Sequence, residues 1–80
     1  MPTKSDFRLV TRAGCHLCMD MEARLEMFAD DNAFEFVVVD VDKDETLLER
    51  FSVDVPVLLN GETVVCKHFY DEDAIKQALQ

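Results

Sequence analysis

The sequence predicts an α/β fold in three layers (α/β/α), in which helices cover both faces of a four-stranded mixed sheet. Apolar residues follow strand and helix spacings in turn, which gives the order β-α-β-α-β-β-α. The pair Asn60-Gly61 stands between two apolar runs and indicates a tight hairpin. A length of 80 residues, 49% of them hydrophobic, provides for one domain over residues 1–80 and not for two separate cores.

The first strand and the first helix are expected near the start of the chain. Phe7–Thr11 is rich in residues that favour strands, and Ala13-Gly14 ends this segment. A helix then begins at about Cys15 and continues to about Asp30. Its apolar residues recur at helical spacings and form one face, made of Leu17, Met21, Leu25 and Phe28.

The middle of the chain has the strongest strand signal. Phe34–Val39 is an almost continuous apolar run, which predicts a strand buried on both faces. Asp42 is expected to cap the next helix, because Glu45 lies three residues later, as in a capping box. This short helix has an apolar stripe of Leu47, Leu48 and Phe51.

The last part of the chain predicts a hairpin and a final helix. Val57–Leu59 is a strand with Pro56 at its mouth, where a missing N–H is tolerated, and Thr63–His68 is the return strand. The final helix begins at about Asp71, where acidic residues suit the positive end of the helix dipole. The first strand, helix and second strand must form a parallel, right-handed crossover, and the hairpin adds an antiparallel edge. The apolar face of the final helix consists of Ala74, Ile75, Ala78 and Leu79.

Charge and composition exclude several classes of function. Seventeen acidic residues against 8 basic ones give a net charge of −9, and the bases are scattered, so we expect no nucleic-acid or membrane partner. No apolar run is long enough to cross a membrane, and the N-terminus has no signal-peptide pattern. Small secreted domains that are stabilised by disulfides usually have a larger, even number of cysteines, whereas this chain has three. We therefore expect a monomeric, cytoplasmic protein.

The most informative motif is Cys15-His16-Leu17-Cys18. Cys15 stands at the opening of a helix, where unpaired backbone N–H groups and the helix dipole stabilise a thiolate and so create a nucleophile. Cys18 lies one helical turn further on and can attack a mixed disulfide formed on Cys15, which releases a reduced partner. His16 either stabilises the neighbouring thiolate when protonated or is an ordinary exposed ring. Cys66 is expected to be a small buried thiol that packs in the core.

Two segments together carry a family resemblance. Gly14–Cys18, followed by Val55–Leu58 ahead of Asn60-Gly61, resembles the glutaredoxin-like proteins of the thioredoxin superfamily, over about Phe7 to Leu79. The resemblance implies a thioredoxin-like fold and a thiol–disulfide oxidoreductase of cell redox homeostasis. It also implies that Cys15 is the nucleophile and Cys18 the resolving thiol.

The resemblance extends to substrate binding. It implies that Pro56 is cis and that Val55 offers its backbone to a substrate peptide or to glutathione. Asp71 could accept from the glutathione amine, and Arg12 either holds a glutathione carboxylate or is a solvated loop charge. The family usually has Pro-Tyr between its cysteines and a Gly-Gly pair before the last helix, whereas this chain has His16-Leu17 and His68-Phe69.

The expected partners and the rival functions follow from the same motif. The substrate is a disulfide-containing protein or a glutathione mixed disulfide, with glutathione as a possible co-substrate and with no bound cofactor or metal. The alternative is a soft-metal module that binds copper or an iron–sulfur cluster through the same cysteines. A copper-chaperone module has the order β-α-β-β-α-β, which differs from the order β-α-β-α-β-β-α that this sequence predicts. A third alternative is a non-enzymatic interaction domain with the same fold.

Overall fold

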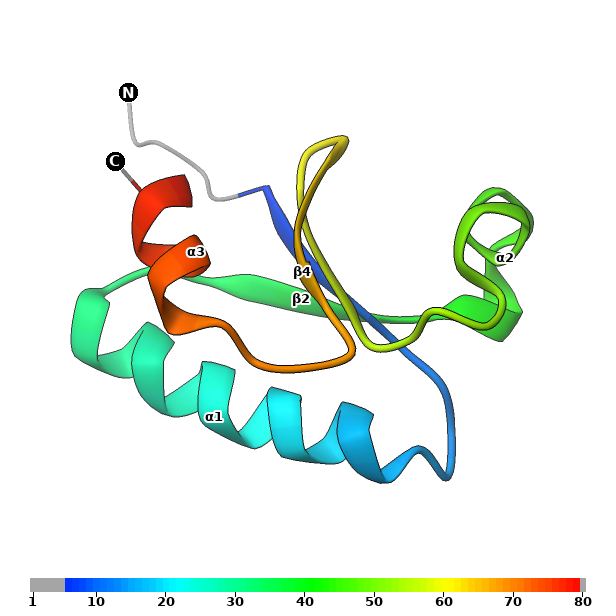
Figure 1. Cartoon of the computed structure of the whole chain (residues 1–80), viewed down its shortest axis with the longest axis horizontal. Coiled ribbons are helices and arrows are strands. Elements are labelled where there is room, and N and C mark those ends of the chain that lie inside the picture. Colours follow the sequence, from blue (N-terminus) through cyan, green and yellow to red (C-terminus); the bar gives the residue numbers. More distant parts are fainter. Residues whose placement is uncertain (1–5, 80) are drawn as a thin grey trace.

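The computed structural model describes residues 6–79 and has the predicted element order (Figure 1). The strands form one mixed sheet in the order β2-β1-β3-β4. In chain order the elements are β1 (Phe7–Thr11), α1 (His16–Asn32), β2 (Phe36–Asp40), a short 3-10 helix η1 (Val41–Lys43), α2 (Glu45–Phe51), β3 (Val57–Asn60), β4 (Thr63–Lys67) and α3 (Glu72–Ala78).

Strand β1 lies in the interior of the sheet and organises it. It pairs parallel with β2, as the predicted crossover requires, and antiparallel with β3. Strands β3 and β4 form the predicted antiparallel hairpin, in which Gly61 has a φ of 62°. Glycine adopts this left-handed conformation without steric cost, which is why the turn is placed there.

The two faces of the sheet carry separate cores, because successive residues of a strand point to opposite faces. Leu9 and Leu58 pack with residues of α1 and α3, and Val10 and Leu59 pack with residues of α2. Figure 1 shows α2 set apart from α1 and α3, with the strands between them. The predicted three-layer α/β architecture is therefore confirmed.

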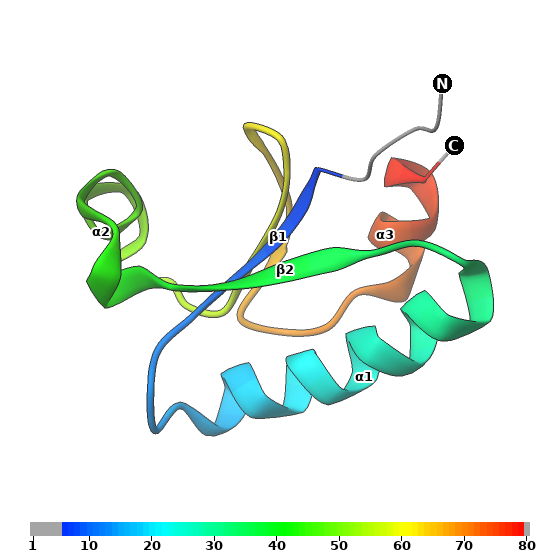
Figure 2. The ribbon, with the colours of Figure 1, turned by 180° about the vertical axis from the view of Figure 1, so that it is seen from behind.

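The prediction that the second strand is buried on both faces is wrong. β2 is an edge strand, and the side chains of Val37 and Val38 are 61% and 43% exposed. Figure 2, which views the molecule from behind, shows β2 in front of the other strands. The strand also begins at Phe36 and not at Phe34, whose ring packs 5.1 Å from that of Phe7, centroid to centroid.

The prediction that Asp42 caps the second helix is also wrong. A 3-10 turn intervenes after β2, so α2 begins later and Asp44 is its cap, with Oδ1 accepting from the Leu47 N–H at 3.1 Å. Asp40 accepts from the Asp42 N–H at 2.9 Å and caps the turn itself. The Asp42 carboxylate is thereby left to bind a distant residue, Arg12.

Several element ends differ from the prediction by a few residues. α1 continues to Asn32 and ends at Ala33, whose φ of 57° breaks the helix. β4 ends at Lys67, because His68 has a φ of 71° and leaves the strand. Asp71 caps α3 at the position where that helix was expected to begin. Within residues 6–79, no helix is both long and apolar enough to span a membrane.

Candidate active site

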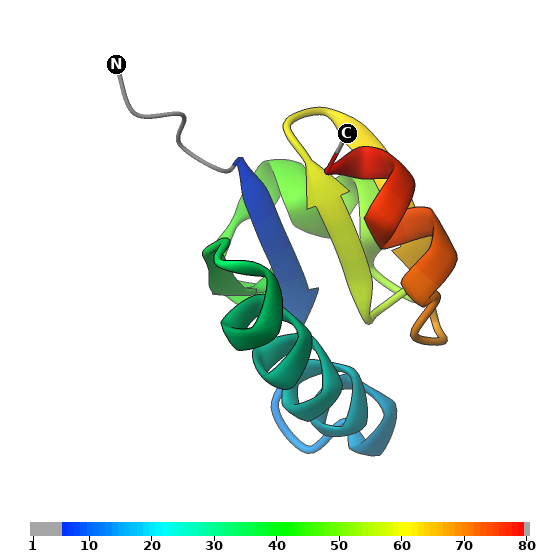
Figure 3. The same cartoon turned by 90° about the vertical axis from the view of Figure 1, so that its left-hand side faces the viewer.

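The sheet brings three separate loops to one of its ends. Val10, near the end of β1, pairs with Val57 at the start of β3, and Val57 pairs with Lys67 at the end of β4. The loop that leads into α1, the residues before β3 and the residues after β4 therefore meet there. Figure 3 shows the tip of the β1 arrow and the start of α1 at this end. We call it the cysteine end of the sheet.

The cysteine end contains a disulfide between Cys15 and Cys18, whose Cα atoms lie 5.1 Å apart. Cys15 is the N-cap of α1, and its Sγ accepts from the Cys18 N–H at 3.0 Å. Gly14 has a φ of 77°, which provides the turn into the helix without strain. The expected placement of a sulfur atom at a helix N-terminus is therefore present.

The two sulfur-bearing residues differ in burial. Cys18 is only 2% exposed, whereas Cys15 is half-buried and the side chains of His16 and Leu17 are exposed. Leu17, at 46% exposure, does not join the buried helix face as predicted, because its place on that face is taken by Cys18. The helix therefore buries one sulfur-bearing side chain and presents the other to solvent.

A proline lies at the same end. The Val55–Pro56 peptide bond is cis, which is the isomer that the family resemblance implies. Pro56 is buried, its carbonyl accepts from the His68 N–H at 2.8 Å, and Val55 is half-buried beside it. Oδ1 of Asp54 lies 3.4 Å from Nε2 of His68, and Oδ2 lies 3.9 Å from Nζ of Lys67. This carboxylate and the Pro56 carbonyl join the loop before β3 to the end of β4.

Arg12 is bound within the protein. Its Nε and Nη2 donate to the two carboxylate oxygens of Asp42 at 3.0 and 2.9 Å, and its Nη1 donates to the Ser52 carbonyl at 2.7 Å. The hydrogen bond to Arg12 lowers the pKa of Asp42 and raises that of Arg12. In this structure Arg12 is therefore paired within the protein, and its contact with a glutathione carboxylate stays a prediction.

The comparisons with known proteins agree with this geometry. A family model described as "Glutaredoxin-like domain (DUF836)" matches residues 7–80. The chain belongs to this glutaredoxin-like family. A glutaredoxin-like protein of Dictyostelium discoideum, the YDR286C homolog, is 28% identical to it over 94% of this chain and 75% of the relative.

Solved structures show that this glutaredoxin-like domain has the thioredoxin fold. Protein Ne2328 of Nitrosomonas europaea is 32% identical, covers 100% of this chain and 96% of its own, and has a TM-score of 0.83. Thioredoxin 1 of Thermosipho africanus, at 17% identity, covers 91% and 92% with a TM-score of 0.63, and supports the fold alone. Family membership and the Cys15–Cys18 pair together point to a redox function.

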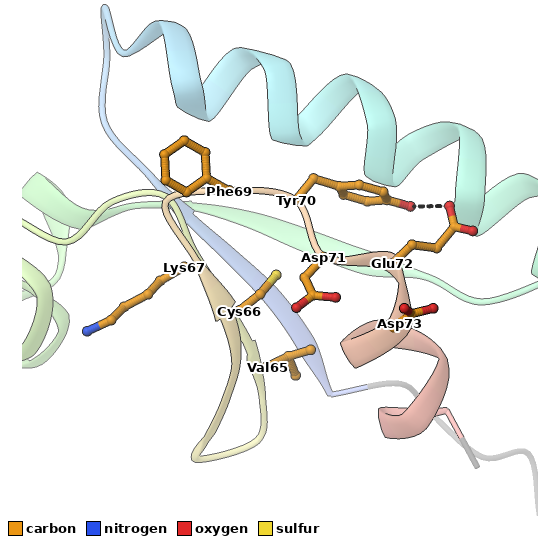
Figure 4. Close-up of a pocket in the computed structure, with 8 residues that line it drawn as sticks. All are labelled: Val65, Cys66, Lys67, Phe69, Tyr70, Asp71, Glu72 and Asp73. Atoms are coloured by element: carbon orange, nitrogen blue, oxygen red, sulfur yellow. Dashed lines mark hydrogen bonds between the residues drawn. The ribbon is translucent and has the colours of Figure 1, made fainter.

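The glutaredoxin-like domain also has a hollow of about 490 Å³ between β4 and α3 (Figure 4). The hollow does not include Cys15 or Cys18. Asp71 lies there and accepts from the Ala74 N–H at 3.1 Å as the cap of α3. The Tyr70 hydroxyl donates to Glu72 at 3.2 Å, and burial together with this bond raises the pKa of Tyr70 to about 12.

Cys66 lies in the same hollow as a buried free thiol, as the sequence predicts. Burial raises its pKa, so the thiol stays protonated at neutral pH. Among residues 6–79, no group of three or more His, Cys, Asp or Glu side chains could hold a metal ion. The observed β-α-β-α-β-β-α order is also not that of a copper-chaperone module.

Sequence reasoning missed Asp42 and Asp54 as members of the cysteine end. The sequence predicts Asp42 as a helix cap and predicts no role for Asp54, and the partner of Asp42 lies 30 positions away along the chain. No local sequence pattern predicts a pairing between residues so far apart in the chain. Only the fold brings these carboxylates to the cations at the cysteine end.

Proposed function

We propose that this domain is a thiol–disulfide oxidoreductase that works through Cys15 and Cys18. The observation that carries the proposal is the disulfide at the N-terminus of α1, in which Cys15 is half-exposed and Cys18 is buried. A sulfur atom at this position accepts from a backbone N–H, and the helix dipole favours its anionic form. The reduced domain therefore has a nucleophile that faces solvent and a second thiol within reach of it.

The reaction has two exchange steps. In the first, the Cys15 thiolate attacks one sulfur of a substrate disulfide, forms a new S–S bond to it and releases the other sulfur as a thiolate. In the second, the Cys18 thiolate attacks Sγ of Cys15, restores the internal disulfide and releases the first sulfur. Two electrons and two protons thus pass from the dithiol to the substrate. A dithiol reductant then returns the domain to its reduced form.

The surroundings of the disulfide suit this chemistry. Pro56 is buried at the cysteine end, and the half-exposed Val55 beside it presents its backbone to a bound substrate. The substrate is a disulfide-containing protein or a glutathione mixed disulfide. An odd, small set of cysteines, one of which is a buried free thiol, is consistent with action in the reducing cytoplasm.

The test is the reduction of a synthetic, uncharged peptide disulfide with dithiothreitol as the electron donor, followed by chromatography of the released thiol. We expect the domain to accelerate the reaction and Cys15→Ser to abolish the acceleration. Cys18→Ser is expected to accumulate a mixed disulfide with the peptide, detected by mass spectrometry. Cys66→Ala is the matched control, because it removes the one cysteine outside the motif.

Two results would overturn this proposal. One is a Cys15–Cys18 pair that cannot be cycled between its oxidised and reduced forms by dithiothreitol. The other is an acceleration that survives in Cys15→Ser. Either would leave the thioredoxin fold as a scaffold for a different activity.

A further inference from the structure

The cations at the cysteine end are held by carboxylates of the protein. Asp42 binds the guanidinium of Arg12 with both oxygens, and Asp54 lies 3.9 Å from Nζ of Lys67 and 3.4 Å from Nε2 of His68. These residues lie at the cysteine end, in the loop before α1, the turn after β2, the loop before β3 and the end of β4. Within residues 6–79, two basic side chains of the segments at this end have no ion pair: His16, between the two cysteines, and Lys43, in the turn after β2.

This arrangement disfavours glutathione. Glutathione carries a carboxylate at each end, and a protein recognises carboxylates with free arginine or lysine side chains. The planar fork of Arg12 would suit that role, but Asp42 and the Ser52 carbonyl already engage three of its nitrogen atoms. The net charge of −9 opposes an anionic substrate further.

The same end presents apolar side chains to solvent. Leu17 stands between the two cysteines and is 46% exposed, and Phe69 is 69% exposed. Phe69 follows His68, which donates its N–H to the Pro56 carbonyl. In Figure 4 the Phe69 ring points away from Tyr70 and Glu72, although Phe69 also lines the hollow that contains Asp71. An extended polypeptide with an apolar side chain beside its disulfide fits these two residues.

We propose that Asp42 and Asp54 are specificity-determining residues that direct the disulfide toward protein substrates and away from glutathione. The pairing with Arg12 withholds that cation from an anionic substrate, and the net charge of −9 of the chain favours basic residues in the substrate. The preferred substrate is an extended polypeptide segment with a disulfide, an apolar neighbour and basic flanking residues. This inference rests on the proposed oxidoreductase function, and the exchange steps are those given above.

The experiment compares three substrates with the same electron donor, dithiothreitol. Two are peptide disulfides of identical length with a leucine beside the cysteine, one flanked by lysines and the other by glutamates. The third is the mixed disulfide of glutathione with a single cysteine. We expect kcat/KM to be highest for the lysine-flanked peptide and about tenfold or more lower for the glutathione mixed disulfide.

The decisive variant is Asp42→Asn, which removes the charge and one of the two acceptor oxygens that hold Arg12, without changing the size of the side chain. We expect it to raise kcat/KM for the glutathione mixed disulfide about tenfold through a lower KM, the effect of one charge-assisted pair of hydrogen bonds. The matched control is Glu62→Gln, which makes the same change in net charge and breaks the ion pair with Arg50 at the hairpin. Circular dichroism and thermal melting verify that both variants fold.

The outcomes separate this inference from the function on which it rests. A wild-type preference for the glutathione mixed disulfide, or an equal response of Asp42→Asn and Glu62→Gln, overturns the specificity role while reduction of the peptides persists. If Lys43→Gln alone abolishes reduction of the glutathione mixed disulfide, glutathione binds through that lysine and the inference is also wrong. Failure with every substrate, with no cycling of the disulfide, overturns the oxidoreductase proposal itself.

Discussion

Cys66 and Cys15 place the same side chain in opposite environments. Cys66 is buried in the core and its pKa is raised, whereas Cys15 caps a helix and is half-exposed. Since only thiolates react with iodoacetamide at a useful rate, we expect the oxidised native protein to be labelled very slowly. After reduction, labelling should be fast at Cys15, and Cys66 should react only in denaturant.

Peptide mapping by mass spectrometry checks this prediction site by site. Cys66→Ala is the control, because the slow fraction should vanish in that variant. Rapid labelling of Cys66 in the folded, oxidised protein would contradict the buried environment that the structure shows.

Tyr70 offers a titration with a single reporter, since the chain contains one tyrosine and no tryptophan. Burial and the bond to Glu72 raise its pKa from 10.0 to about 12. As the pH rises from 10 toward 12, the unfolded phenol ionises before the folded one, so this group makes the protein less stable over that interval. Ultraviolet phenolate absorbance should therefore show a midpoint near 12.

Glu72→Gln should lower the Tyr70 midpoint only in part, because burial is the larger cause of the raised pKa. The same protein in urea provides the unfolded reference. A midpoint of 10 in protein that circular dichroism shows to be folded would refute the assigned environment.

At the residue scale, the sequence predicts what short motifs encode. The roles of Cys15 and Cys18 follow from one local motif, the cis isomer at Pro56 follows from the family resemblance, and the structure places all three at one end of the sheet. Asp42 and Asp54 could not be predicted, because their partners are brought to them by the fold. A carboxylate in a loop has the same local sequence whether it is solvated or holds a distant arginine.

At the element scale, the start of α2 depends on Asp44. Its Oδ1 accepts from the Leu47 N–H at 3.1 Å and satisfies a donor that the helix cannot pair. Asp44→Ala should lower the free energy of unfolding by about 1 kcal/mol, measured by urea denaturation. Asp44→Asn keeps a capping oxygen and should retain most of the stability, so an equal loss in both variants would exclude the capping role.

The Arg12–Asp42 pair joins the loop before α1 to the 3-10 turn after β2, and its contribution depends on pH. The pKa of Asp42 is lowered in the folded state, so the pair stabilises the fold above the unfolded pKa of about 4. As the pH falls further, the unfolded state takes up a proton first, and the stabilisation is lost as the folded pKa is passed.

The measurement for this pair is the urea midpoint of wild type and of Asp42→Asn as a function of pH. We expect wild type to be the more stable protein at neutral pH and the difference to close in acid. Both side chains are partly exposed, so high salt should also shrink it. A difference that stays constant from neutral pH to acid would show that Asp42 acts through packing and not through its charge.

The second strand shows why element types are easier to predict than element environments. The apolar run at Phe34–Val39 correctly indicates a strand, but an apolar run does not tell whether the strand is central or at an edge. The sheet order decides this, and it places β2 at the edge with Val37 and Val38 exposed. The 3-10 turn after β2 likewise moves the helix start from Asp42 to Asp44 without a strong local signal.

At the scale of the whole molecule, the sheet separates two cores and collects the reactive residues at one end. The alternation of Leu9 with Val10 and of Leu58 with Leu59 assigns side chains to the two cores. This architecture could be predicted because strand alternation and the element order are both local patterns. The sequence predicts the net charge of the chain, −9, but it does not predict which charged side chains surround the cysteine end.

The sum of charge nevertheless predicts a kinetic signature. A molecule of charge −9 attracts cationic reactants and repels anionic ones, and salt screens both effects. We therefore expect the reduced domain to be oxidised by cystamine, a dication, at a rate that falls as ionic strength rises. Oxidation by glutathione disulfide, an anion, should speed up over the same range, about 0.01 to 0.5 M salt.

Bis(2-hydroxyethyl) disulfide is the uncharged reference, and its rate should change little with salt. Opposite slopes for cystamine and glutathione disulfide would mean that the field of the whole domain acts on the reacting sulfur. Slopes of the same sign would contradict the prediction, because screening of a net charge cannot speed up the approach of both a cation and an anion. Repeating the series with Asp42→Asn separates the effect of the net charge of the molecule from the effect of the single residue Arg12. One charge among many should hardly change the slope, whereas a freed Arg12 should change the affinity for glutathione disulfide.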